Sequence, residues 1–170
     1  GGSKYCIRDS YIAVGVNALD AQTTADGNTA VGYAAGTALT TGEKNVAMGE
    51  SALATATTGT YNVAIGVAAL NSSTTAENNT AVGKNALTAN TIGANNTAVG
   101  FDALMTSTTT SSNTAVGYNA LKLSTGGTVL LLVIWLLAMI LLVVKIQHSA
   151  HRLLKEILLV YIIWLVVNML

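Results

Sequence analysis

The sequence predicts a parallel β-solenoid, or β-roll, of seven 17-residue coils followed by apolar transmembrane α-helices. Three observations predict this fold class: a strict 17-residue repeat, alternation within each repeat, and a change to almost pure Leu, Val and Ile after Gly127. The expected division is an N-terminal tail at 1–10, a β-roll repeat domain at 11–127 and a transmembrane helical domain at 128–170.

The first ten residues precede the repeat and are expected to form a loose tail. This segment holds Cys6, the one cysteine of the chain, so an internal disulfide is excluded. We expect Cys6 to be a free thiol.

The repeat is marked by a glycine that recurs with a 17-residue period, without insertion or deletion, at positions 15, 32, 49, 66, 83, 100 and 117. Alanine stands two residues before and three residues after each of these glycines. Asparagine stands four residues before six of them, and leucine four residues after six, with Gly36 as the exception in the leucine column. Threonine stands eight residues after each glycine.

A 17-residue period is too short for a helical hairpin and suits one coil of a β-solenoid. The phrase Asn62–Gly66 alternates as a strand does, with Val63 and Ile65 on one side and Ala64 and Gly66 on the other. The Thr-rich stretch has turn chemistry. Coils about 4.8 Å apart would make a rod of roughly 34 Å from seven repeats.

The larger apolar side of the strand is expected to face inward and to form the core. The predicted core ladder is Val31, Ile65, Val82, Val99 and Val116 with Leu53, Leu70, Leu87 and Leu104. The Ala and Gly columns would then form a flat outer face that lets another backbone approach. We expect sister chains to bury this face by closing about an axis along the rod.

The residue after each repeat glycine varies most, which indicates exposure to solvent. Tyr33, Phe101 and Tyr118 stand at this position. They predict either a surface for a ligand or the decoration of a stable rod, since isolated surface aromatics are common.

The phrases "NVAIG" at Asn62–Gly66 and "NTAVG" at Asn96–Gly100 resemble the head repeats of trimeric autotransporter adhesins, the YadA-like heads. The resemblance covers residues 11–125. It implies a homotrimer of left-handed parallel β-rolls and a possible surface ligand on a host. The period is longer here than in the best-known heads.

After the repeat, residues 129–144 are sixteen consecutive apolar residues, and 157–167 are apolar again. Such runs predict helices in a lipid bilayer. Two arrangements are open: a hairpin that turns near His148, or one long helix. In the hairpin, basic residues gather at one membrane boundary, with the β-roll outside the bilayer on the opposite side. These boundary residues are Lys145, His148, His151, Arg152 and Lys155.

No catalytic motif, cofactor motif or metal-ligand set occurs, and the net charge is zero, so neither an enzyme nor a nucleic-acid partner is expected. The abrupt junction indicates an engineered chimera of a natural adhesin-type rod and a designed transmembrane bundle. The function expected is a structural, membrane-anchored trimeric scaffold. The alternatives are an adhesin or fibre segment that binds a host surface, and a helical pore.

Overall fold

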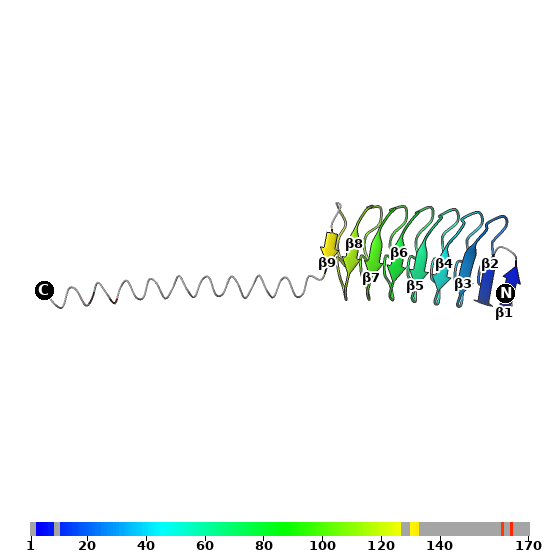
Figure 1. Ribbon diagram of the computed structural model, residues 1–170, viewed down its shortest axis with the longest axis horizontal. Helices are drawn as coiled ribbons and strands as arrows, with labels where there is room; N and C mark the ends of the chain where they lie inside the picture. The colour runs from blue at the N-terminus through cyan, green and yellow to red at the C-terminus, as the bar shows by residue number, and fades with distance from the viewer. Residues whose placement is uncertain (1–2, 9–10, 127–129, 133–160, 162–163, 165–170) are drawn as a thin grey trace. The chain divides into compact units, whose positions relative to one another are not determined.

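The computed structural model describes residues 3–8, 11–126 and 130–132, together with Tyr161 and Trp164. Nine strands form one sheet in the order of the chain, β1 to β9 (Figure 1). Their bounds are β1 Ser3–Arg8, β2 Tyr11–Val16, β3 Asn28–Val31, β4 Val46–Met48, β5 Val63–Ile65, β6 Thr80–Val82, β7 Thr97–Val99, β8 Thr114–Val116 and β9 Leu130–Leu132.

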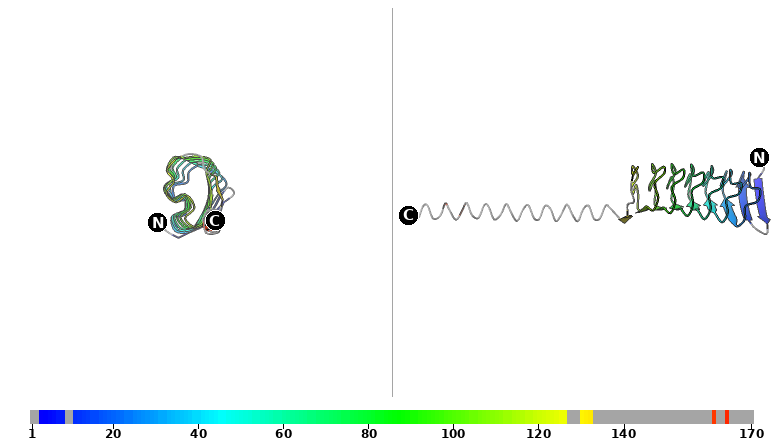
Figure 2. Two further views of the ribbon diagram at one scale, coloured as in Figure 1. Left: turned by 90° about the vertical axis from the view of Figure 1, so that its left-hand side faces the viewer. Right: turned by 90° about the horizontal axis from the view of Figure 1, so that it is seen from above.

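The strands from β2 to β8 pair in parallel, each with the strand of the next coil. Ala13 lies beside Ala30, Ala30 beside Ala47, and the same column continues to Ala115. Seven strands in this register enclose six full turns of a β-solenoid. Viewed along the stacking direction, the coils superpose closely (Figure 2, left). The coil fold and the period therefore agree with the prediction.

The N-terminal segment is part of the sheet. Strand β1 pairs antiparallel with β2, from Ser3 beside Val16 to Arg8 beside Tyr11. The expectation of a loose tail at 1–10 is thus wrong for residues 3–8. The antiparallel strand uses the backbone groups that β2 would otherwise leave unpaired at the end of the solenoid.

The interior is built from the alanine and leucine columns. Leu53, Leu70, Leu87 and Leu104 are buried, together with the alanines two before and three after each glycine, such as Ala64 and Ala69. The valine part of the predicted core ladder is corrected: Val31, Val82, Val99 and Val116 are only half-buried, and Ile65 is exposed. These side chains point outward because Ala64 and its equivalents occupy the inward positions of the strand.

The small inward side chains follow from the narrowness of each coil. The part of each coil that faces the strand across the interior, called here the opposite wall, carries the leucine column. Each leucine fills the space that a second large side chain on the strand would need. The leucines adopt positive φ, 47° at Leu19 and 49° at Leu70, so this wall consists of turns and forms no second strand.

In the coil that contains Gly36, a different side chain fills the interior space that leucine fills in the other coils. Gly36 occupies the leucine position with φ of +59°, and the buried Leu39 lies three residues further on, where Ala56 stands in the next coil. A Cβ atom at Gly36 would lie 3.0 Å from the Leu19 and Leu39 side chains. Leu39 therefore replaces the volume that Gly36 lacks.

Two polar ladders bond the coils to one another. In the buried asparagine column, Asn62 Nδ2 donates to Asn45 Oδ1 at 3.2 Å and to the Ala76 carbonyl at 2.8 Å, while Asn62 Oδ1 accepts from the Asn79 amide at 3.0 Å. In the threonine column, the Thr40 hydroxyl donates to the Thr57 carbonyl at 3.1 Å. Buried polar groups thus find partners in the next coil.

The sheet continues past the repeat. Strand β9 pairs in parallel with β8, with Leu131 beside Ala115, so residues 130–132 are an extra rung and the prediction of a helical domain from 128 is wrong for them. The chain divides into two compact units at Val133. Within the described part of the chain, no helix is long and apolar enough to cross a membrane. Of the predicted transmembrane domain at 128–170, residues 128–129, 133–160, 162–163 and 165–170 lie outside the described residues.

Candidate interaction surfaces

The outward face of strands β2 to β8 carries two columns of side chains, one residue and three residues before each repeat glycine. We call these two columns the outer strip. Every member is apolar or threonine, and none is charged: Ile12, Val14, Thr29, Val31, Val46, Met48, Val63, Ile65, Thr80, Val82, Thr97, Val99, Thr114 and Val116. Six steps of about 4.8 Å give the strip a length of roughly 29 Å.

The outer strip is only partly covered by its own chain. Ile12 and Met48 are each 39% exposed and Ile65 is 37% exposed, although all three belong to a continuous sheet. The sequence predicted that the Ala and Gly columns would form the outer face, and this assignment is wrong because the alanines are buried inside the coil. A long, uncharged face of partly exposed, mostly apolar side chains is typical of a surface that binds another protein.

The column of residues directly after the repeat glycines lies beside the outer strip and contains the three predicted surface aromatics. Phe101 and Tyr118 occupy neighbouring coils, with ring centroids 5.3 Å apart and an interplanar angle of 12°. Tyr118 is 76% exposed. Tyr33 is exposed as well, but it lies four coils from Phe101, about 19 Å along the rod. The structure therefore brings together two of the three predicted surface aromatics.

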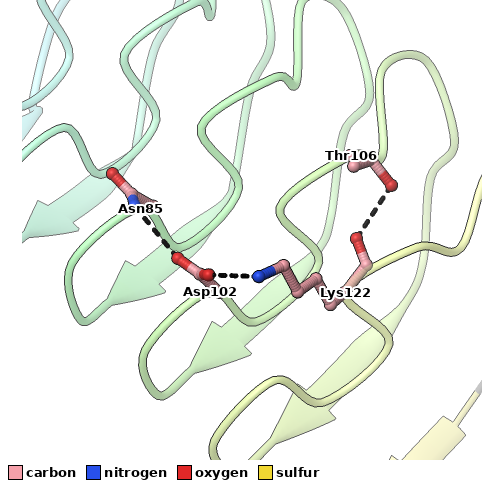
Figure 3. Close-up of polar contacts among 4 residues, drawn as sticks. All are labelled: Asn85, Asp102, Thr106 and Lys122. Atoms are coloured by element: carbon pink, nitrogen blue, oxygen red, sulfur yellow. Dashed lines mark hydrogen bonds and ion pairs between the residues drawn. The ribbon is translucent and has the colours of Figure 1, made fainter.

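A charged cluster near the C-terminal end of the repeat was not predicted from the sequence (Figure 3). The Lys122 ammonium lies 2.7 Å from Asp102 Oδ2, and Asn85 Nδ2 donates to Asp102 Oδ1 at 3.0 Å. Asp102 is buried, and the hydrogen bond from Lys122 lowers its pKa, assisted by the bond from Asn85. The cluster joins three successive coils, so its clearest role is structural.

A second contact between coils lies on the other side of the outer strip. Lys44 Nζ donates to Tyr61 Oη at 3.3 Å and stands 5.2 Å from the centre of the Tyr61 ring. The hydrogen bond to Tyr61 raises the pKa of Lys44. The 17-residue spacing of Lys44 and Tyr61 is the signal by which this pair could have been found in the sequence.

Among the described residues, no group of three or more His, Cys, Asp or Glu side chains is arranged to hold a metal ion. The predicted membrane-boundary residues Lys145, His148, His151, Arg152 and Lys155 lie outside the described residues. Of the apolar residues after strand β9, Tyr161 and Trp164 are described, with ring centroids 6.3 Å apart.

Comparison with known proteins adds no relative. No protein-family model, no curated protein and no solved structure matches the chain.

Proposed function

We propose that the chain is a structural scaffold: a β-roll that associates with copies of itself into a trimer and is anchored in a membrane by its apolar tail. The observation that carries the proposal is the outer strip. It offers each copy the same uncharged face, and a rotation axis parallel to the rod would bring these faces together. This face replaces the alanine face that the sequence suggested.

Association through the outer strip is supported by the fold of the single chain. The interior needs no partner, because the alanines and leucines already bury one another. The half-exposed valines are the apolar groups that gain from a partner, at about 25 cal/mol per Å² of apolar surface removed from water. The number of copies, three, is the expectation that the resemblance to YadA-like heads implies.

The membrane anchor is proposed from the sequence of the apolar residues that follow strand β9, at 133–144 and 157–167. These two apolar runs exceed what a narrow rod could cover. In this proposal the rod provides a soluble mass outside the bilayer and the tail provides attachment, as in a chimera of two parts.

The test is the mass of the full-length chain in detergent, corrected for bound detergent, together with the melting temperature of the rod. We expect the mass of three chains. Ile65→Lys should loosen the assembly and lower the melting temperature, because the charge would be buried between copies. Thr58→Lys is the matched control, since Thr58 is exposed and lies outside the outer strip. A monomeric wild-type chain, or equal tolerance of both lysines, contradicts the proposal.

The stacked pair Phe101 and Tyr118 favours a second candidate, an adhesive segment that binds a host surface. Stacked rings present an amphipathic face to a ligand at little conformational cost. Binding of the full-length chain to host cells should then fall with Tyr118→Ala and not with Tyr33→Ala. Both tyrosines are more than half exposed, so neither change should alter the fold. Equal binding by the wild type and the Tyr118 variant would remove this candidate.

A further inference from the structure

Charged side chains flank the outer strip on both sides. The end edge is the residue directly after each repeat glycine, where the only charges are Glu50 and Lys84. In the described part of the chain, Glu50, Glu77 and Lys84 make no ion-pair contact, although Lys84 lies close enough to Asp102 to help lower the pKa of that carboxyl. The start edge is the turn before each strand, and it lies five or six residues before a repeat glycine. Each coil is named by its repeat glycine. From the coil of Gly32 onward, the charged residues of the start edge are Asp26, Glu43, Lys44 and Glu77.

In two coils the two edges carry residues of opposite charge. The coil of Gly83 carries Glu77 on its start edge and Lys84 on its end edge. The coil of Gly49 carries Lys44 on its start edge and Glu50 on its end edge, with the half-buried Glu43 beside Lys44. The end edge is therefore charged only in the two coils whose start edge carries the opposite charge.

Within one chain these partners cannot meet, because a strand and its flanking residues lie between them. Strand β6 separates Glu77 from Lys84, and its three residues alone span about 10 Å. In an assembly about an axis parallel to the rod, each coil lies level with the same coil of its neighbour, and the start edge of one copy meets the end edge of the next.

We infer that ion pairs between neighbouring copies, Glu77 with Lys84 and Lys44 with Glu50, hold the rods parallel and level with one another. This inference rests on the proposed self-association and adds the edges and the axial register. A slip by one coil in either direction would place Lys84 against an uncharged turn. Glu50 would then face either an uncharged turn or Asp26, which repels it. The apolar outer strip repeats in every coil and would tolerate such a slip, so the charges supply the register that the strip lacks.

An antiparallel pair of rods is the competing arrangement. A two-fold axis through the coil of Gly66 would set Glu50 against Lys84 of the other copy, which is also an attractive pair. The sequence favours the parallel arrangement, because under the proposed anchoring the apolar residues 133–144 of all copies would follow the same end of the rod and share one bilayer.

Charge reversal in the full-length chain in detergent distinguishes these arrangements. Lys84→Glu should lower the melting temperature of the rod by roughly 2–6 °C at low salt and by less in 1 M salt. Adding Glu77→Lys should restore the wild-type value, whereas adding Glu50→Lys should not. As a second measurement, Glu77→Cys with Lys84→Cys in a Cys6→Ser background should give covalent oligomers with a short bis-maleimide.

The outcomes of these measurements separate the inferred ion pairs from the proposed self-association. Restoration by Glu50→Lys in place of Glu77→Lys means antiparallel rods and overturns the inference alone. An oligomer that is unaffected by Lys84→Glu and gives no covalent oligomer also overturns it, while self-association stands. A wild-type chain that is monomeric at every concentration overturns the proposed function, and the inference fails with it.

Discussion

Exchanging the side chains at positions 36 and 39 tests how the interior of the solenoid is filled. Leu39 is fully buried, and it lies in the coil where Gly36 replaces the usual leucine. The double variant Gly36→Leu with Leu39→Ala gives this coil the pattern of the next one, where Leu53 and Ala56 occupy the same columns. The double variant should therefore be nearly as stable as the wild type.

The two single changes should each be costly. Leu39→Ala leaves a cavity and should lower the free energy of unfolding by about 2–5 kcal/mol. Gly36→Leu adds a side chain whose Cβ would lie 3.0 Å from Leu39 and Leu19, an overpacking worth about 1–3 kcal/mol. Backbone strain adds a separate cost of about 1 kcal/mol, because a leucine at positive φ is strained, but Leu53 with φ of 53° shows that the equivalent position tolerates it.

The assay is urea unfolding of the full-length chain in detergent, followed by the circular dichroism of the β-structure, for the wild type, both single variants and the double variant. We expect the double variant within about 1 kcal/mol of the wild type, and thus a coupling energy of at least about 2 kcal/mol between the two positions. Additive losses, with a coupling below about 0.5 kcal/mol, would refute the view that Leu39 fills the space left by Gly36.

Three further predictions concern the backbone, the asparagine ladder and the charged cluster. Gly66→Ala should destabilise the rod far more than Gly117→Ala in thermal melting: their φ values are 130° and 132°, but a Cβ at Gly66 would lie 2.6 Å from the Gly83 carbonyl, whereas at Gly117 the nearest atom among the described residues is 3.9 Å away. Equal losses would show that backbone strain alone matters. Asn62→Ala should cost roughly 3 kcal/mol in urea unfolding, because it leaves the Ala76 carbonyl and the Asn79 amide without their partners; a loss below about 0.5 kcal/mol would mean that water replaces the ladder. Asp102 has a lowered pKa, so its pairing with Lys122 stabilises the fold fully above the ordinary carboxyl pKa of about 3.9 and less as the pH falls through the lowered value. Asp102→Asn, which matches Asn85 in the same column, should flatten the acid limb of a plot of melting temperature against pH, and an unchanged limb would assign that limb to other carboxyls.

The sequence was sufficient for the period, the stacking and the place of strands β2 to β8. Ala13 pairs with Ala30 and so on to Ala115 because a strict 17-residue repeat sets like residues beside like in every coil. The Asn and Thr ladders follow from the same repetition. The contact between Phe101 and Tyr118 could also be read from their 17-residue spacing, which places them on neighbouring coils.

What the sequence by itself left open is which side of the strand faces inward. Alternation separates Ala64 from Val63 and Ile65, but all three are apolar, so hydrophobicity alone favours burying the larger ones. The tertiary structure decides the opposite way, because Leu70 and its equivalents enter from the other wall and leave room only for a methyl group beside them. The volume available inside a closed coil depends on the side chains of both walls, so the residue pattern of one strand does not determine it. For the same reason, the pairing of β1 and the exchange of volume between Gly36 and Leu39 became visible only when the coils were stacked.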